Sequence, residues 1–155
     1  MWALMDDNRA IILEDGQDID VMFALGICIS GDMIAIDHDG ECVGGAWFGD
    51  ETPEASTGLQ PLHRTLHLLV EPRYWRYVLK QGILEQILDH AFKKWPIGKI
   101  KAEPNSTQKH AMRLLKRVKF KQVAVLYKDT YVNGVKTDRH LFELRRKYWE
   151  TYRQK

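Results

Sequence analysis

The chain has 155 residues, of which 45% are hydrophobic, and this size suits one compact domain with its own core. It has no apolar run of membrane-spanning length and no signal segment at its start, so we expect a soluble, cytoplasmic protein. Residues 1–60 carry 13 Asp or Glu and one Arg, a net charge of −12, whereas residues 61–155 carry a net charge of +14. Either the halves neutralise each other in the fold, or they form an acidic wall and a basic wall for different ligands.

The first third of the chain predicts a strand, a helix and a hairpin. Residues 9–13, "RAIIL", form a short apolar run typical of a strand. Residues 15–30 begin with turn and capping residues and then space their apolar side chains as a helix does. The runs "MIAID" and "CVGGAWF" flank the turn signal "HDGE", so residues 33–48 predict an antiparallel hairpin.

A buried strand and a long helix are predicted next. The run "RTLHLLV" (64–70) has few polar residues, which is typical of a central strand. After a proline-broken turn, an amphipathic helix is predicted, and Pro96 with Gly98 ends it. Its apolar stripe consists of Leu79, Ile83, Ile87, Leu88 and Ala91.

The remainder of the chain predicts a strand at "KIKAE" (99–103), a second amphipathic helix at residues 106–120 and two strands around Asn133-Gly134. The last strand leads into a basic, aromatic C-terminal tail. The whole order predicts a single α+β domain over residues 1–155, with a mixed, largely antiparallel sheet and helices on both faces.

The turn after "RTLHLLV" is a candidate anion site. A strand that leads into a helix N-terminus leaves backbone N–H groups and the positive end of the helix dipole at one spot, which suits a phosphate or pyrophosphate. The usual glycines are missing here, but Arg76 and Lys80 would supply charge from their side chains. An ordinary solvated first turn is the alternative interpretation.

In the order of its elements, nearly the whole chain resembles the GCN5-related N-acetyltransferase superfamily. In that family the fourth strand splays from the fifth, and acetyl-CoA lies in the gap with its pyrophosphate on the turn into the next helix. The family's turn reads Arg or Gln, two residues, Gly, one residue, then Gly or Ala; here Arg76 matches, while Leu79 and Gln81 replace the small residues. The resemblance implies an acetyl-CoA site made of Leu68, Val70, Arg76, Leu79, Lys80, Gln81, Gly82 and Asn105.

The second helix also resembles its counterpart in the family. The segment "PNSTQKHAMRLLKRVKF" is similar to the family's Asn-containing helix, which ends in a Gly-Phe pair; here that pair is Lys119-Phe120. The tyrosine often used as general acid falls at Leu115, and Asn105 lies about three residues earlier than usual. The closing "YVNGVKTDRHLFELRRKYW" resembles the last hairpin of acetyltransferases.

The resemblance implies transfer of an acetyl group from acetyl-CoA to an amine of a small molecule or a protein. The acidic N-terminal third is then expected to border the acceptor side and the basic remainder the CoA side. The small phage-encoded members that the chain resembles include some with virion-assembly roles. The alternative is therefore a non-catalytic protein of this fold that acts in phage virion (head) assembly or protein binding, in the host cytoplasm or the virion.

Acetyl transfer requires a base for the amine, a donor for the carbonyl oxygen and an acid for the leaving thiolate. The backbone N–H near Val70 would be the donor if the strand bulges there. His67 and Glu71 share one face of that strand and are the candidate bases. A packed strand histidine is the alternative for His67.

Several other features of the sequence are interpreted first as structural and only second as functional. Cys28 and Cys42 are expected to be reduced core residues. The motif "DHD" (37–39) fits turn geometry better than a metal site. The basic helix face of Lys109, Arg113, Lys116 and Arg117 fits CoA, nucleic acid or water, and no nucleic-acid reader motif accompanies it, so nucleic acid is not expected as a partner. The tail, with Tyr148, Trp149 and Tyr152, either packs on the sheet or binds a protein partner.

Overall fold

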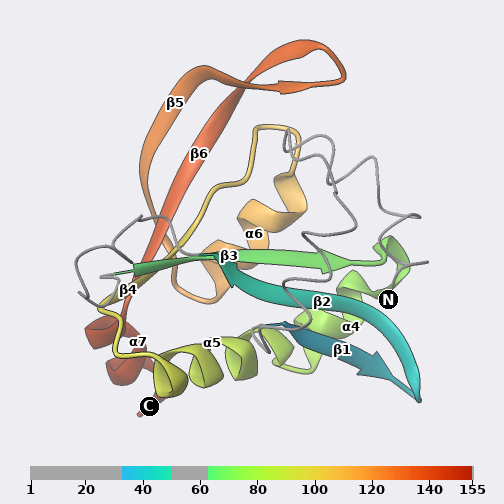
Figure 1. The fold of residues 1–155 in the computed structure, drawn as a ribbon, viewed down its shortest axis with the longest axis vertical. Coiled ribbons are helices and arrows are strands. Elements are labelled where there is room, and N and C mark those ends of the chain that lie inside the picture. The colour runs from blue at the N-terminus through green and yellow to red at the C-terminus, as the bar shows by residue number, and fades with distance from the viewer. Residues whose placement is uncertain (1–32, 50–62, 155) are drawn as a thin grey trace, which may run out of the picture.

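The computed structural model describes residues 33–49 and 63–154, and Figure 1 shows them as a twisted sheet with helices packed along it. The strand predicted at residues 9–13 and the helix predicted within residues 15–30 lie outside the described residues. No helix in the described ranges is long and apolar enough to cross a membrane. The elements are β1 (Ile34–His38), β2 (Glu41–Gly49), β3 (His63–Val70), the short 3-10 helix η2 (Pro72–Tyr74), α4 (Trp75–Lys80), α5 (Ile83–Lys94), β4 (Lys99–Ala102), α6 (Lys109–Arg117), β5 (Lys121–Val132), β6 (Val135–Arg145) and α7 (Arg146–Arg153).

Six strands form one sheet in the order β1-β2-β3-β4-β6-β5. Every neighbouring pair is antiparallel except β3 and β4, which are parallel. The predicted α+β class with a mixed, largely antiparallel sheet is therefore confirmed. β3 contains the run "RTLHLLV" and lies inside the sheet, so its predicted central position is confirmed as well.

The β1–β2 turn explains the motif "DHD". Asp39 and Gly40 both take positive φ, 54° and 83°, which suits the twist of a tight hairpin. The Gly40 N–H donates to Oδ1 of Asp37 at 3.1 Å. The two aspartates thus serve turn geometry, as predicted.

The helix predicted after β3 is divided in the structure. α4 ends at Lys80, Gly82 takes a left-handed φ of 64°, and α5 begins at Ile83. The apolar stripe continues across the break, because Leu79 and Ile83 still pack against the core. Periodicity therefore could not reveal the break, whereas glycine is the residue that adopts this backbone conformation without a steric penalty.

One hydrophobic core joins the sheet to the helices. Its buried side chains come from β1, β2, β3, β4 and β6 and from α4, α5, α6 and α7. Within β3, Leu66 and Val70 are buried in this core and Leu68 packs against it. Leu69 and Trp47 are also buried but lie outside this cluster. Because successive strand residues point to opposite faces, the odd-numbered residues of β3 face away from the helical core.

The C-terminal tail is the helix α7, which packs on α5. Trp149 is 2% exposed and belongs to the core, and its indole N–H donates to Oδ1 of Asp89 at 2.8 Å. Arg153 forms an ion pair with the other oxygen of Asp89 at 2.7 Å. The tail therefore follows the packing alternative, and it leaves Tyr148 on the surface.

Candidate functional site

β3 and β4 pair only at their first residues. The register joins His63–Thr65 to Lys99–Lys101 and goes no further. After β4 the chain follows β6 instead: the His140 N–H donates to the Pro104 carbonyl at 2.8 Å, and Asn105 forms a bridge with Arg139. We call this separation the split; it is bordered by residues 66–70 on one side and 102–106 on the other. It lies where the resemblance implies acetyl-CoA.

The backbone of β3 supplies donors to the split without a bulge. The Glu71 N–H donates to the Val43 carbonyl at 3.0 Å, which makes this a hydrogen-bonded pair of the antiparallel ladder. Such pairs alternate with pairs whose N–H groups point away from each other, and the β2–β3 register has no shift from Gly49–Thr65 to Gly44–Val70. The N–H groups of Leu68 and Val70 consequently point away from β2 and toward the split.

The α-helix that begins nearest β3 is α4, but the candidate anion site lies at the start of α5. α4 has only six residues, and Arg76 lies in its first turn. α5 has 12 residues and begins at Gly82, so the N–H groups of its first turn and its dipole are available. Aligned on Gly82, the family's turn pattern falls on Leu79, Gly82 and Leu84. Only the middle position then carries the expected small residue.

The charges around this helix start partly oppose each other. Arg76 and Lys80 are exposed, and neither forms an ion pair with another residue in the described ranges. Glu85 lies in the first turn of α5, and a Cβ placed on Gly82 would lie 3.7 Å from its Oε2. The segment around Gly82 therefore carries two cations and one carboxylate. The residues fit a bound pyrophosphate, with Glu85 as the group that opposes it.

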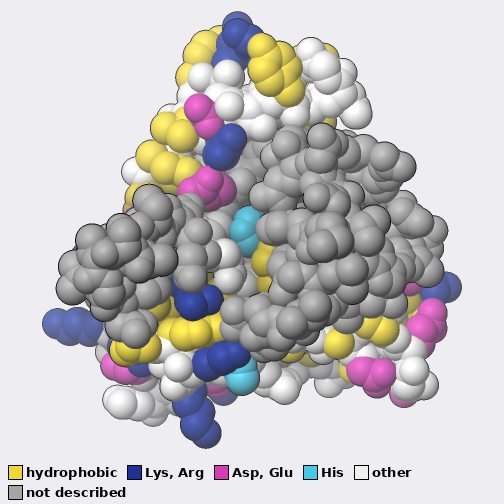
Figure 2. All heavy atoms as spheres, viewed as in Figure 1, with side chains coloured by type: hydrophobic (Ala, Val, Ile, Leu, Met, Phe, Trp, Pro, Cys, Tyr) yellow, Lys and Arg dark blue, Asp and Glu magenta, His cyan; other side chains and the backbone are white. Residues whose placement is uncertain are grey.

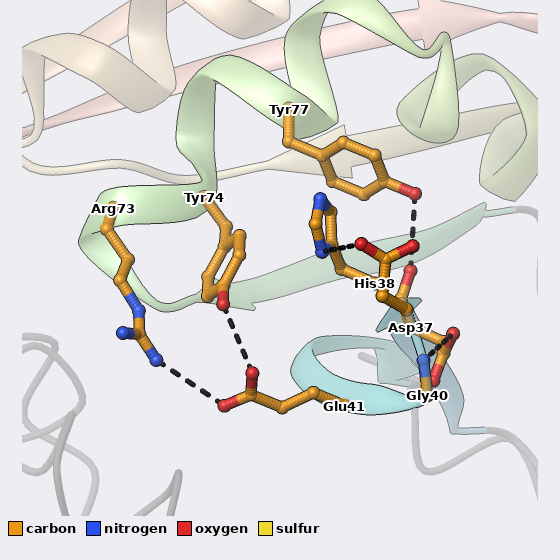
Figure 3. Close-up of polar contacts among 8 residues, drawn as sticks. Asp37, His38, Gly40, Glu41, Arg73, Tyr74 and Tyr77 are labelled. Carbon is orange, nitrogen blue, oxygen red and sulfur yellow. Dashed lines mark hydrogen bonds and ion pairs between the residues drawn. The ribbon is translucent and has the colours of Figure 1, made fainter.

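A cluster that the sequence interpretation missed ties the β1–β2 turn to η2 and α4 (Figure 3). We call it the clasp; it consists of Asp37, His38, Glu41, Glu71, Arg73, Tyr74 and Tyr77. Tyr74 donates to Oε2 of Glu41 at 3.2 Å, and Tyr77 donates to the Asp37 carbonyl at 3.3 Å. Arg73 forms ion pairs with Glu41 and Glu71. In the sequence, the only sign of the clasp is that polar and aromatic residues follow the β1–β2 turn and the turn after β3.

Aromatic contacts and electrostatics support the clasp. The His38 ring lies 4.4 Å from the ring of Tyr77 in an edge-on arrangement and 5.2 Å from that of Tyr74. Desolvation raises the pKa of Tyr74, and the hydrogen bond to Glu41 raises it further against the opposing charge of Arg73. Desolvation lowers the pKa of Arg73, but the carboxylate of Glu71 leaves that pKa above its usual value. The clasp thus favours a neutral Tyr74 and a charged Arg73.

The two candidate bases have different surroundings. His67 stacks on Trp47 with ring centroids 5.2 Å apart and an angle of 10° between the rings. A Cβ on Gly49 would lie 3.3 Å from its Nε2, so the imidazole lies over β2 on the face opposite the helical core. Glu71 follows the end of β3 and is engaged by Arg73 in the clasp. The structure gives the two side chains separate partners.

Asn105 and the Lys119-Phe120 pair have structural roles at the two ends of α6. Asn105 is buried, and its Oδ1 accepts hydrogen bonds from the N–H and hydroxyl of Thr107 at 2.9 and 2.6 Å. Leu115, at the position of the family's tyrosine, is buried in the core. Lys119 takes a φ of 72°, and the Phe120 N–H donates to the Leu115 carbonyl at 3.0 Å. This is the capping geometry that usually employs glycine.

Comparison with solved structures finds the same fold in several N-acetyltransferases. A ribosomal-protein-alanine N-acetyltransferase from Brucella melitensis matches with a TM-score of 0.74 and 14% identity over 93% of this chain and 92% of that one. A protein classed as an acetyltransferase, YncA from Salmonella typhimurium, was determined with acetyl-CoA and matches with a TM-score of 0.75 and 16% identity over 93% and 86%. No family model and no curated protein sequence matches the chain.

Two further matches with lower TM-scores are also acetyltransferases. The spermidine/spermine N-acetyltransferase SpeG from Vibrio cholerae matches with a TM-score of 0.65 and 12% identity over 78% of this chain and 67% of that one. A GNAT-family acetyltransferase from Bacillus anthracis matches with a TM-score of 0.64 and 12% identity over 80% and 71%. At these identities the likeness shows a shared fold, and function must be argued from the site.

Proposed function

We propose that this protein is an acyl-CoA-dependent N-acetyltransferase that acts on an amine of a small molecule or a protein. The observation that carries the proposal is the split between β3 and β4, with the N–H groups of Leu68 and Val70 pointing toward it. The acetyl-CoA-bound YncA structure, which shares this fold, supports the cofactor.

The residues around the split would divide the binding between them. The first turn of α5, after Gly82, would hold the pyrophosphate, with Arg76 and Lys80 adding charge from α4. Leu79 and Gln81 would line the approach, and buried Asn105 would fix the start of α6 on the far side. Bound acetyl-CoA would supply an activated thioester carbonyl. The N–H groups of Leu68 and Val70 would donate to its oxygen.

His67 is the better of the two candidate bases. Its imidazole lies on the face opposite the helical core, supported by Trp47, and histidine is the side chain that changes charge most readily near neutral pH. Glu71 is engaged by Arg73, so its carboxylate already has a cationic partner in the clasp. His67 would therefore remove the proton of the attacking ammonium group, and Glu71 would hold the clasp.

Calorimetric titration of the purified chain with acetyl-CoA tests the cofactor site. We expect binding, and we expect Arg76→Ala to weaken it by about 1–3 kcal/mol, the range for a lost charge-assisted hydrogen bond. Arg145→Ala, which removes an exposed arginine of β6, serves as the control and should bind as the wild type does. Absence of binding at millimolar acetyl-CoA contradicts the proposal.

Turnover with a panel of primary amines tests the base. We expect His67→Ala to lower kcat without changing the affinity for acetyl-CoA, because the proposal puts the acceptor amine on the face of β3 that carries the imidazole. Glu71→Gln should affect stability more than kcat. Equal loss of turnover in both variants would contradict the assignment of His67.

A non-catalytic role of the same fold is the second candidate. When the family's turn pattern is aligned on Gly82, Leu79 stands where the pattern has Arg or Gln, and Leu84 stands where it has a small residue. Glu85 would bring a carboxylate to the position proposed for the pyrophosphate. If acetyl-CoA does not bind, these three residues explain why. The protein would then act as a binding module, for example in virion assembly.

A further inference from the structure

A serine and a histidine meet at one border of the split. Oγ of Ser106 lies 2.9 Å from Nε2 of His140. The backbone holds the two residues side by side, because the His140 N–H donates to the Pro104 carbonyl at 2.8 Å and the Ser106 N–H donates to the Asp138 carbonyl at 2.9 Å. This border of the split therefore carries a hydroxyl joined to an imidazole.

The proposed acetyl transfer needs one more group. It has a candidate base and two backbone donors for the carbonyl oxygen, but the departing thiolate also needs a donor. Leu115 stands where the family has a tyrosine, and it is buried in the core. Among residues 66–70 and 102–106, which border the split, Ser106 carries the only hydroxyl.

The two other polar side chains in residues 102–106 already have partners. Glu103 pairs with Arg139 at 3.3 Å, and Arg139 also pairs with Asp129 at 3.0 Å. Figure 2 shows side chains of both charges close together in the part of the molecule where β5 and β6 project from the sheet. The amide oxygen of Asn105 is held by the N–H and hydroxyl of Thr107. The serine hydroxyl is therefore the best-placed donor on this border.

Ser106 lies on the face of the sheet that carries the helices. The pairing of Ala102 with Phe142 continues without a shift to the bridge made by the residue before Ser106. Because side chains alternate along a strand, Ser106 shares the face of Ala102 and Phe142, two residues of the helical core. Leu84 in the first turn of α5 belongs to the same core, and His67 lies on the opposite face. A cofactor held by its pyrophosphate at α5 would thus enter from the serine's face, and the amine from the histidine's.

The hydrogen-bond partners assign the protons of the pair. Oγ of Ser106 lies 3.4 Å from the Asp138 carbonyl oxygen, which can only accept. The hydroxyl proton therefore points to that carbonyl, and Nε2–H of His140 donates to Oγ. Nδ1 of His140 then carries a bare lone pair; it is buried and has no hydrogen-bond partner among the described residues. Proteins leave a buried acceptor unpaired more often than a buried N–H, which agrees with this tautomer.

We propose that Ser106 is a catalytic residue whose hydroxyl donates to the sulfur of the departing thiolate, and that His140 is its positioning residue. A hydroxyl proton rotates to suit its acceptor. When it turns to the sulfur, the Asp138 carbonyl keeps the Ser106 N–H as its donor, and Nε2–H of His140 keeps Oγ in place. The inference rests on the proposed acetyl transfer.

The step balances without a further reactant. The attacking nitrogen loses one proton to His67 and one to water as its bond to the acetyl carbon forms. The C–S bond breaks, and its electron pair stays on sulfur. Ser106 stabilises the resulting charge with its hydroxyl, and the thiolate takes a proton from water after release.

Steady-state kinetics of the full chain with acetyl-CoA and a primary amine tests Ser106. We expect Ser106→Ala to lower kcat about 10- to 100-fold, the range for a lost hydrogen bond to a charged group, while calorimetry gives an unchanged affinity for acetyl-CoA. Ser106→Thr keeps the hydroxyl and should retain most of kcat. Thr151→Ala removes an α7 hydroxyl that donates to the Lys147 carbonyl; it is the matched control and should turn over as the wild type does.

A double variant shows whether His140 acts through Ser106. His140→Leu should lower kcat about tenfold, the effect of losing one hydrogen bond, and His140→Gln, which keeps an N–H donor, should restore part of it. Ser106→Ala combined with His140→Leu should be no slower than Ser106→Ala alone, because the histidine then has nothing to position. Losses that add would overturn the positioning role.

The thiol of bound CoA gives a readout that is independent of turnover. A hydrogen bond to the thiolate favours the charged form, so the pKa of that thiol, followed by ultraviolet absorbance, should be about one pH unit lower in the wild type than in Ser106→Ala. Equal thiol pKa values, or normal turnover of Ser106→Ala, overturn the inference and leave the proposed function standing. Loss of acetyl-CoA affinity in Ser106→Ala at unchanged circular dichroism also overturns it, and makes Ser106 a binding residue. A wild type that does not bind acetyl-CoA removes both the inference and the proposed function.

Discussion

Lys119 occupies a position that favours glycine. It takes a φ of 72° after α6, and a non-glycine residue in this region costs roughly 1–2 kcal/mol. Glycine would remove this cost but increase the entropy of the unfolded chain. We therefore expect Lys119→Gly to raise the free energy of unfolding by about 0.5–1 kcal/mol, measured from the urea midpoint. Lys116→Gly, inside the same helix, is the control and should lower that free energy by about 1 kcal/mol.

Glu85 is the residue that would oppose an anion in the proposed site at the start of α5. Its carboxylate lies by Gly82 in the first turn, where a negative charge interacts favourably with the helix dipole. Glu85→Gln removes that charge, so acetyl-CoA should bind about two- to fivefold more tightly, corresponding to ~0.3–1 kcal/mol. Calorimetry measures the change, with Glu150→Gln on α7 as the control. Weaker binding in Glu85→Gln would mean that the pyrophosphate does not lie at this helix start.

At the candidate site, backbone alternation decides which N–H groups of β3 face the split, and no bulge at Val70 is needed. Leu68 and Val70 have N–H groups that point toward the split because they alternate along an unbroken strand. The position of the proposed anion site could not be predicted in the same way. Arg76 matched a pattern, but the helix start at Gly82 depends on one left-handed residue, and the apolar spacing of Leu79 and Ile83 is the same with or without it.

At the scale of elements, hairpins and strands were predictable because turn residues and alternation are local signals. The clasp was not, because it joins the β1–β2 turn to η2 and α4 across more than 30 positions of the chain, as in the hydrogen bond between Tyr74 and Glu41. Its members are exposed or half-buried polar and aromatic residues. Such residues give no periodic pattern, and only the folded chain shows that they meet.

The clasp has a predictable response to alkaline pH. The pKa of Tyr74 is raised in the folded state, so the neutral phenol is favoured there. The resulting stabilisation is fully present below the ordinary tyrosine pKa of about 10 and is lost as the pH rises through the higher folded value. We expect the stability difference between wild type and Tyr74→Phe to be constant near neutral pH and to shrink above about pH 10.

Urea unfolding across this pH range measures the difference, and phenolate absorbance follows the ionisation. Tyr148→Phe provides the comparison, since the Tyr148 ring lies outside the clasp. If the difference between wild type and Tyr74→Phe grew with pH, the sign of the pKa shift would be wrong.

At the scale of the whole molecule, the ion pairs of the described residues mostly stay within one part of the chain. Six ion pairs of the described residues join two residues of the basic part of the chain, including Lys99 with Glu143 and Arg153 with Asp89. Among the described residues, the ion pair that crosses between the two parts is Arg73 with Glu41. Neutralisation between the halves is therefore limited in the described ranges. Whether the acidic third borders the acceptor side stays a prediction, because much of it lies outside those ranges.

The C-terminal helix gives the last prediction, because its sequence left open whether it packs on the sheet or binds a partner, and its position makes it part of the core. Trp149 is 2% exposed and hydrogen-bonds to Asp89 of α5. Trp149→Ala should cost about 3–5 kcal/mol by leaving a cavity, a large part of the ~5–15 kcal/mol that stabilises a domain. Tyr148→Ala, next to it and exposed, should change the free energy of unfolding by less than about 0.5 kcal/mol. Urea denaturation measures both values; equal effects would place α7 outside the core, and deletion of residues 147–155 would then leave the fold intact.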